Sequence, residues 1–465
     1  MQYFSTRGQA PRLGFDDVLL AGLAEDGGLY LPESWPVLSP DTLAGLSGRP
    51  YAEVAATVMR PFLAGSCALD ALDDLCARAY GRFAHSATCP LVQLEESLWV
   101  QELFHGPTLA FKDVALQLLG DLFDHVLSHR DSRITIVGAT SGDTGSAAIE
   151  ACRDRERVDI FILHPKGRTS EVQRRQMTTV DSANVHNIAV EGTFDDCQTL
   201  VKAMFNDPGF RAEQGLAAVN SINFARILAQ TVYYVTAAVA LGAPYRPMTF
   251  AVPTGNFGNV FAGYAAKRMG VPMERLIVGS NRNDILTRFF ETGKMEAREV
   301  APTLSPSMDI QVSSNFERLL HDLLGGSSVE LVRVMERFKQ AGRFELTPEA
   351  VEEARNVFAG ARYDDDETLA EIARVWREAG MLLDPHSAIG VAAARKLRLS
   401  RAVPVVALAT AHPAKFPDAV ERATGQRPPL PERLADLYDK AERYEILPND
   451  LAAIQAHVRA RSRAR

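Results

Sequence analysis

A lysine at the start of an apolar helix is the first residue whose type and position could do chemistry. Residues 103–113 read LFHGPTLAFKD, so a Gly-Pro turn precedes Lys112. Downstream, apolar residues recur at helical spacing: Ala115, Leu118, Leu119, Leu122 and Val126. The pattern predicts a buried helix with Lys112 in its first turn, where the helix dipole and poor hydration both disfavour an ammonium ion. The Lys112 amine is therefore a candidate nucleophile, although an arbitrary lysine at such a position would extend to water.

Two further loops have the pattern of an anion site, since each follows an apolar strand and opens a helix. Residues 254–259 read TGNFGN, and their glycines allow backbone N–H groups to converge on a phosphate at the helix N-terminus. Residues 139–145 read ATSGDTG, in which Ser141, Thr144 and the loop amides could bind a carboxylate. Either loop could instead be a structural connection or a capped helix start. The first loop matches neither GK[ST] nor GxGxxG, which disfavours a nucleotide enzyme.

A hydroxyl at the end of another strand completes the set. Residues 403–410 read VPVVALAT, so Thr410 ends an apolar strand and is followed by AHPAKF. Its hydroxyl could bond a ring nitrogen, or it could satisfy local backbone. A nucleophilic lysine, a phosphate cup, a second anion site and a ring-nitrogen partner together indicate pyridoxal 5′-phosphate (PLP), bound as a Schiff base. His412 is interpreted as a structural histidine, and because the histidines lack metal-ligand spacing, no metal is expected.

These loops must be positioned by a mostly parallel sheet, and the chain has the alternation that builds one. Strand-like segments, each followed by a helical segment, occur at 133–137, 158–163, 185–190, 248–252 and 275–279. Ligand loops are then expected at the carboxyl ends of the strands. Changes in the pattern of strand-like and helical segments along the chain predict five regions. They are an N-terminal region at 1–92, a PLP-binding α/β core at 93–296 that carries Lys112 and the phosphate loop, an inserted helical subdomain at 297–380, a return to the core at 381–430, and C-terminal helices at 431–465.

Composition narrows the class of protein and its partners. The 465 residues have a net charge of −8 and no long basic run before 459–465, so no nucleic-acid partner is expected. The 5 cysteines form no CxxC pair, which favours a reducing cytoplasm over a disulfide framework. The N-terminus has no signal-peptide pattern, and no apolar run reaches membrane-spanning length, so no membrane partner is expected.

Taken together, the motifs resemble the threonine synthase family in its longer bacterial and fungal form. They are FHGPTLAFKD, ATSGDTG, NSINFARILAQ at 220–230, PTGNFGN, LDPHSAIG at 383–390 and ATAHPAKF, and they extend over nearly the whole chain. The resemblance implies the PLP fold of the tryptophan synthase β-subunit group (fold type II). In this α/β fold, two mostly parallel-sheet lobes hold PLP between them, here with an N-terminal helical region and the inserted subdomain.

The resemblance also assigns residues by position. It makes Lys112 the Schiff-base lysine and Thr410 the partner of the pyridine nitrogen. The cup for the PLP phosphate would be Gly255, Asn256, Phe257, Gly258 and Asn259. The substrate would be bound by Thr140, Ser141, Gly142, Asp143 and Thr144, with Asn220 and Arg226 at positions that touch the substrate phosphate in shorter family members. Arg226 could instead form an ion pair with a surface carboxylate, and then Arg7 and Lys415 become the next candidates for the substrate phosphate.

The implied reaction converts O-phospho-L-homoserine and water to L-threonine and phosphate. Lys112 would remove the Cα proton, a Cβ proton would then be lost as phosphate leaves from Cγ, and water would add at Cβ. A related PLP-dependent threonine or serine dehydratase, or a phospho-amino-acid lyase, would share Lys112 and the cup but has no use for a second phosphate site. A catalytically silent binding protein with the same fold is a further alternative. Either a monomer or a homodimer is compatible with the sequence.

Overall fold

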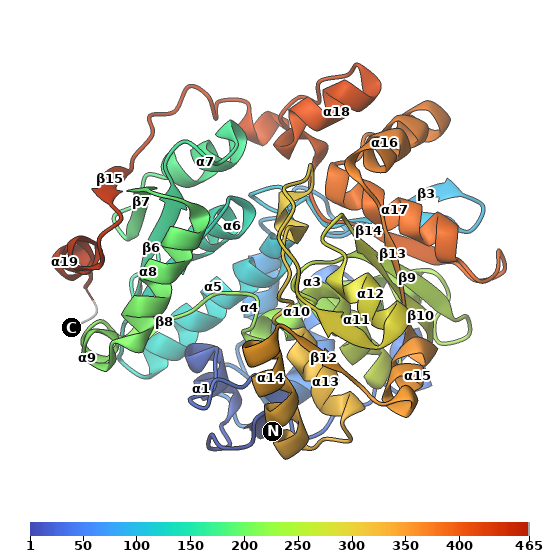
Figure 1. The fold of residues 1–465 in the computed structure, drawn as a ribbon, viewed down its shortest axis with the longest axis horizontal. Helices are drawn as coiled ribbons and strands as arrows, with labels where there is room; N and C mark the ends of the chain where they lie inside the picture. Colours follow the sequence, from blue (N-terminus) through green and yellow to red (C-terminus); the bar gives the residue numbers. More distant parts are fainter. Residues whose placement is uncertain (464–465) are drawn as a thin grey trace.

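Two sheets frame the molecule in the computed structural model, which describes residues 1–463 (Figure 1). The 6-stranded sheet has the order β13-β10-β9-β14-β4-β3, and all neighbours pair in parallel except β3 and β4. In that order its strands are Phe358–Arg362, Met273–Ser280, Met248–Pro253, Val405–Ala409, Leu98–Glu102 and Leu91–Glu95. Ligand loops are therefore expected beyond the carboxyl ends of β9 and β14.

The second sheet is 5-stranded and wholly parallel, with the order β15-β7-β6-β5-β8. Its strands are Glu445–Pro448, Val185–Glu191, Val158–Pro165, Ile134–Ala139 and Leu216–Ala217. Every residue of β6 is buried, because helices cover both faces of a parallel sheet, and its sequence VDIFILHP is accordingly almost continuously apolar. The expected α/β fold with two mostly parallel-sheet lobes is confirmed.

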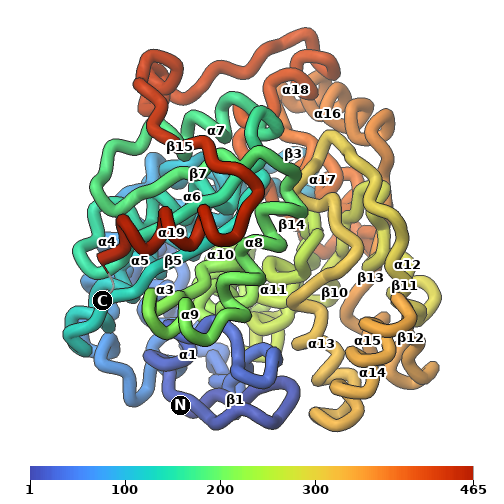
Figure 2. The backbone as a smooth tube through the Cα atoms, turned by 60° about the vertical axis from the view of Figure 1, so that its left-hand side comes forward, coloured from blue at the N-terminus to red at the C-terminus, as the bar shows by residue number. Residues whose placement is uncertain are grey.

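Helices follow the strands as the alternation predicts. Those of the 5-stranded lobe are α6 (Asp143–Cys152), α7 (Glu171–Thr178), α8 (Phe194–Asn206) and α9 (Pro208–Glu213). The C-terminal helix α19 (Leu451–Arg461) packs against α8 (Figure 2). Those of the 6-stranded lobe are α10 (Phe224–Ala240), α11 (Gly258–Arg268), α12 (Ile285–Thr292), α17 (Pro385–Leu397), η3 (Pro413–Lys415) and α18 (Pro417–Thr424).

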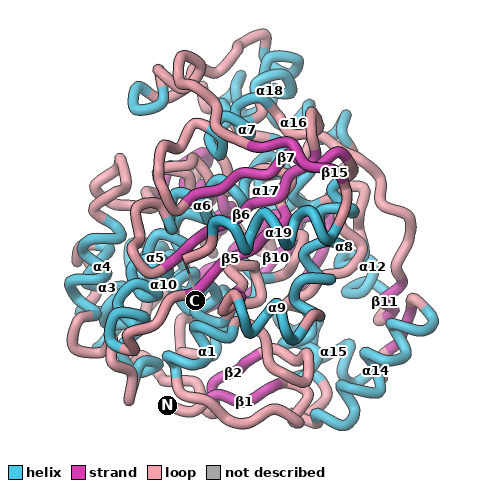
Figure 3. Tube along the Cα trace, turned by 90° about the vertical axis from the view of Figure 1, so that its left-hand side faces the viewer, coloured by secondary structure: helices cyan, strands magenta, loops and turns pink. Residues whose placement is uncertain are grey.

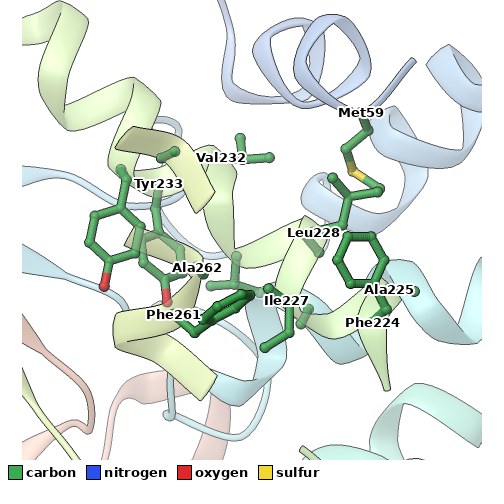
Figure 4. Close-up of a cluster of buried hydrophobic side chains, with 14 of the residues drawn as sticks. Met59, Phe224, Ala225, Ile227, Leu228, Val232, Tyr233, Phe261 and Ala262 are labelled. Atoms are coloured by element: carbon green, nitrogen blue, oxygen red, sulfur yellow. The ribbon is translucent and has the colours of Figure 1, made fainter. Parts of the chain in front are cut away.

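The helix that begins at Lys112 joins the two lobes. α5 (Lys112–His129) contacts α6 of one lobe and α10 of the other. Phe224 and Leu228 of α10 form an apolar cluster with Met59 and with Phe261 of α11 (Figure 4). This packing fixes α10 against α11, so the start of α11 has a rigid support.

The N-terminal region packs against α5 and α10, the two helices at the junction of the lobes. Strands β1 and β2 pair antiparallel near the N-terminus (Figure 3). The elements are β1 (Tyr3–Ser5), α1 (Phe15–Ala21), β2 (Tyr30–Pro32), α2 (Pro40–Gly45), α3 (Tyr51–Met59), η1 (Arg60–Leu63) and α4 (Leu72–Tyr80). None of the helices within residues 1–463 combines the length and apolar character that a bilayer crossing requires.

Two segments expected to be helical also contain strands. The segment 297–380 has η2 (Pro306–Met308), α13 (Phe316–Leu323), α14 (Ser328–Ala341), α15 (Pro348–Val357) and α16 (Asp365–Ala379). It also contributes β12 (Arg343–Glu345), which pairs with β11 (Lys294–Glu296), and the edge strand β13, which pairs with β10. Of the predicted C-terminal region 431–465, residues 464–465 lie outside the described residues. Residues 431–463 have η4 (Glu432–Leu434) and α19, but between them β15 pairs with β7. The expectation of helices alone was wrong here, because short edge strands are defined by a distant partner and not by local periodicity. The region boundaries stay predictions.

Candidate active site

The start of α5 is fastened to the end of β14, which brings Lys112 and Thr410 to one place. The Phe111 N–H donates to the Thr410 carbonyl at 2.8 Å, and the His412 N–H donates to the Leu109 carbonyl at 3.0 Å. Thr410 is 6% exposed. Within residues 1–463 its hydroxyl donates to no other residue, so it is available to a ligand.

Lys112 lies in a nearly dry environment. Its side chain is 11% exposed, and its Nζ lies 3.6 Å from Asp143 Oδ2 and 5.0 Å from the Phe111 ring centroid. Burial lowers the pKa of Lys112, the nearby charges of Lys415 and Arg226 lower it further, and Asp143 opposes them. The predicted preference for a neutral amine therefore has a structural basis.

The loop 254–259 forms an open cup at the start of α11. Phe257 adopts a left-handed conformation with φ of 61°, which turns the chain into the helix. Within the described residues 1–463, no N–H group from 255 to 260 donates to another residue. Such a row of free N–H groups at a helix N-terminus suits a phosphate. At Asn259, Oδ1 accepts from Tyr234 Oη at 2.9 Å, whereas the buried Nδ2 has no partner among these residues.

The loop with Ser313 and Asn315, which contains none of the predicted motifs, hydrogen-bonds to the backbone of this cup. The Ser313 hydroxyl donates to the Gly255 carbonyl at 2.8 Å, and the Asn315 N–H donates to the Asn256 carbonyl at 3.1 Å. A Cβ atom added at Gly255 would lie 3.0 Å from the Ser307 carbonyl oxygen. The glycine is thus needed for close approach of the two loops. Sequence reasoning missed these residues, since the contacts join positions that are more than fifty residues apart in the chain.

The loop 139–145 also has free N–H groups at the start of a helix, but the hydroxyl side chains within it differ in role. Thr140 Oγ1 accepts from the N–H groups of Gly142 at 3.0 Å and Gly145 at 2.9 Å, so this hydroxyl shapes the loop. Ser141 is exposed and Thr144 half-buried. Among residues 1–463 the N–H groups of Ser141, Asp143 and Thr144 have no acceptor, which leaves a cradle for a carboxylate.

Asp143 contacts both buried lysines of the site. Its Oδ1 lies 3.0 Å from Lys415 Nζ and accepts from Gln173 Nε2 at 2.9 Å, while its Oδ2 accepts from the Ser307 hydroxyl at 3.5 Å. Burial alone would raise the pKa of Asp143, but Lys415, Lys112 and the Gln173 hydrogen bond together hold it far below its usual range. Asp143 is therefore ionised, and its charge is shared between two lysines.

Arg226 is a buried guanidinium without a carboxylate. It is 2% exposed, its Nη1 donates to the Val219 carbonyl at 3.0 Å, and its Nε has no partner among the described residues. No carboxylate lies within 4.0 Å of it in residues 1–463. The alternative of an ion pair with a surface carboxylate is wrong. Burial lowers the pKa of Arg226 to about 10, so it stays charged at neutral pH.

The other candidates for the substrate phosphate differ from Arg226. Asn220 is exposed, and its Oδ1 accepts from the Ile222 N–H at 3.4 Å. Arg7 is engaged by Glu317, with Nη2 at 2.9 Å from Oε2, so it is not a free cation. Lys415 is 0% exposed and already bonded to protein acceptors.

A dyad next to Thr410 was contained in a motif but had no expected role. Asp384 Oδ2 lies 2.7 Å from His386 Nδ1, and His386 Nε2 accepts from the Ser307 N–H at 3.2 Å. The Ser387 hydroxyl bonds to Asp384 and accepts from the Thr410 N–H at 3.0 Å. The dyad thus ties the loop around Ser307 to the end of β14.

Comparison with known proteins gives the family. Three family models match in chain order: "Threonine synthase N terminus" at 2–80, "Pyridoxal-phosphate dependent enzyme" at 85–350 and "Threonine synthase, C-terminal" at 387–458. The threonine synthase of Pseudomonas aeruginosa is 57% identical over 459 residues, which cover 98% of each chain. This chain belongs to the threonine synthase family. The resemblance stated from the motifs is confirmed.

Solved structures of the threonine synthase family agree in fold. The PLP-bound threonine synthase from Brucella melitensis matches with a TM-score of 0.98 at 54% identity, covering 100% of both chains. Yeast threonine synthase matches with a TM-score of 0.94 at 39% identity, covering 99% of this chain and 98% of the other. The chain is thus a PLP-dependent enzyme of this family, and its lysine, its open cup and its free Thr410 hydroxyl fit that cofactor.

Proposed function

We propose that this chain is a threonine synthase that converts O-phospho-L-homoserine and water to L-threonine and phosphate. The observation that carries the choice of substrate is Arg226, a buried guanidinium with an unpartnered Nε, close enough to lower the pKa of Lys112. It would supply a phosphate site separate from the cup at 254–259. A dehydratase acting on threonine or serine has no phosphate to place there, so that alternative is not favoured.

The cofactor would be held by three parts of the chain. Lys112 would carry it covalently, the free N–H groups of Gly255, Asn256, Phe257, Gly258 and Asn259 would bind its phosphate, and the Thr410 hydroxyl would meet its ring nitrogen. PLP, when bound, supplies an electron sink for negative charge that develops on the substrate.

The chain's other groups would act on the substrate. The N–H groups of Ser141, Asp143 and Thr144 would bind its carboxylate at the start of α6. The Lys112 amine would take the Cα proton, which requires that amine to be neutral. Arg226 would hold the phosphate group through charge-assisted hydrogen bonds until it leaves from Cγ. The role of Asn220 stays a prediction.

A product assay tests the proposal. The purified enzyme with PLP would be incubated with O-phosphohomoserine, homoserine or O-phosphoserine, and amino acids, 2-oxo acids and inorganic phosphate would be quantified. We expect threonine and phosphate in equal amounts from O-phosphohomoserine alone. Formation of 2-oxobutanoate in place of threonine would support the dehydratase alternative. A colourless protein that takes up no added PLP would support a silent binding protein.

The proposal includes a cytoplasmic location and a monomer or homodimer that acts on a small molecule. Cys67, Cys76, Cys89, Cys152 and Cys197 are all free, and four of them are buried. Free buried thiols support a reducing compartment. The net charge of −8 supports the absence of a nucleic-acid partner.

A further inference from the structure

Lys415 is a buried lysine that the proposed chemistry does not use. It lies in η3, shortly after β14 and Thr410, and it is 0% exposed. Its Nζ donates to the Thr108 carbonyl at 2.7 Å and to Gln176 Oε1 at 2.8 Å, and it lies 3.0 Å from Asp143 Oδ1. An ammonium has three donors, and here each has an acceptor. Lys415 therefore has no free donor with which to bind a substrate phosphate.

Lys112 competes with Lys415 for the same carboxylate. Lys112 Nζ lies 3.6 Å from Asp143 Oδ2, a longer separation than the 3.0 Å between Lys415 Nζ and Oδ1. Among residues 1–463, Asp143 is the only carboxylate within 4.0 Å of either amine. One carboxylate cannot balance two ammonium ions in a poorly hydrated site, so the less favourably held amine gives up its proton.

We propose that Lys415 is a positioning residue that occupies the charge of Asp143 and thereby keeps the Lys112 amine neutral. The inference deepens the proposed function, because it rests on Lys112 acting through a neutral amine. Lys415 would do so without touching substrate or cofactor.

Of the other charged groups around this pair, Arg226 and His386 act in the same direction, and Asp113 lies near Lys415 and is held by Thr108. Arg226, on α10, adds positive charge near Lys112. His386, on α17, adds positive charge near Asp143 when protonated. Asp113 is bound through both oxygens to the N–H and hydroxyl of Thr108, at 2.8 and 2.7 Å. These groups do not provide Lys112 with a second carboxylate partner.

The test measures the protonation of Lys112 directly. Full-length protein freed of PLP would be pulse-labelled with acetic anhydride across a range of pH, and labelling at Lys112 and at exposed Lys202 would be quantified by mass spectrometry. Only the neutral amine reacts, so the pH midpoint reports protonation, whereas a change in access alters the rate at every pH alike. Lys202 in the same sample is the internal reference.

Two charge-removing variants are compared with a conservative one. In Lys415→Met and in Lys415→Gln, which retains a hydrogen-bond donor, we expect the Lys112 midpoint to rise by about one pH unit or more. Labelling below the midpoint would then be roughly tenfold slower. Lys415→Arg should keep the midpoint.

An unchanged Lys112 midpoint in either folded charge-removing variant would overturn the inference. If Lys415→Met does not fold, Lys415→Gln carries the test, and Asp143→Asn must lower the midpoint because it removes the shared carboxylate. A rise in Asp143→Asn would equally refute the inference. Since no substrate is present, a raised midpoint in a protein that makes no threonine would refute the proposed function and leave this inference standing.

Discussion

Replacing Arg226 with methionine tests whether this residue holds the substrate phosphate. Arg226 is 2% exposed, its Nη1 donates to the Val219 carbonyl at 3.0 Å, and its Nε has no partner among residues 1–463. Methionine retains an unbranched stem of similar course and removes the charge, so the packing on α10 should change little. The variant therefore isolates the electrostatic contribution.

The size of the expected fall in kcat/KM follows from the burial of the Arg226 guanidinium. Burial lowers the pKa of Arg226 from 12.5 to about 10, which corresponds to roughly 3 kcal/mol of unfavourable free energy for the charged form. A bound phosphate would offset this cost, and loss of a buried charged contact typically costs ~2 to 5 kcal/mol. We expect kcat/KM for O-phosphohomoserine to fall roughly 30- to 1,000-fold, which corresponds to a loss of ~2 to 4 kcal/mol of transition-state stabilisation.

The assay combines steady-state kinetics with two readouts that do not depend on turnover. The PLP absorbance of Arg226→Met should match that of the unmodified enzyme. Without ligand the Tm of the variant should stay close to that of the unmodified enzyme, because removal of a desolvated charge offsets the lost hydrogen bond to the Val219 carbonyl. Inorganic phosphate should raise the Tm of the unmodified enzyme more than that of the variant.

Arg318 provides a matched control. It is also fully buried, but its Nε donates to the Tyr30 carbonyl at 3.1 Å and its Nη2 to the Ile222 carbonyl at 2.7 Å. Arg318→Met should therefore lower the Tm, because it leaves buried acceptors unpaired. Near-normal kinetics in Arg226→Met, or loss of PLP from it, would show that Arg226 is a structural residue and that the substrate phosphate is held elsewhere.

Three further predictions concern the cofactor and stability. Lys112→Ala should abolish both the near-visible absorbance of bound PLP and activity, and retention of both would contradict the assigned role. Gly255→Ala should weaken PLP binding about tenfold in equilibrium dialysis, since its Cβ would lie 3.0 Å from the Ser307 carbonyl oxygen. An unchanged Kd would show that the loop 254–259 can shift to accommodate the added methyl group. Burial raises the pKa of Asp113 from 3.8 to about 6. The native state therefore binds more protons than the unfolded state between these pH values, and stability falls as pH rises through them. In urea unfolding, the free energy of unfolding of Asp113→Asn should exceed that of the unmodified enzyme by up to about 3 kcal/mol above pH 6, and the two should converge below about pH 4. A difference that does not change with pH would show that the pKa of Asp113 is not raised.

Residues whose structure is locally encoded could be predicted from the sequence. The apolar spacing after Lys112 predicts α5, which begins at that residue. The glycines and short polar residues of 254–259 predict a strand-to-helix turn, and the structure has the turn with free N–H groups. In each case one stretch of chain determines both the element and the chemistry, because helix periodicity and turn residues act over a few positions.

Residues whose role depends on a distant partner could not be predicted. The Asp143–Lys415 pair joins two elements more than two hundred residues apart, and nothing in the local sequence distinguishes Lys415 from a solvated lysine. Ser313 and Asn315 lie in a polar loop whose contact with the cup depends on how α13 packs. The edge strand β13 follows α15 directly, and its residues FAGAR lack a strand period.

The fate of solvent oxygen distinguishes the proposed reaction from simple hydrolysis of the phosphate ester. The enzyme with PLP would act on O-phosphohomoserine in ¹⁸O-labelled water, and both products would be analysed by mass spectrometry. We expect one labelled oxygen in the hydroxyl of threonine and none in phosphate, because the phosphate leaves with its ester oxygen and water adds at Cβ. Label in the phosphate, or an unlabelled homoserine product, would mean that the chain hydrolyses the phosphate ester and would contradict the account.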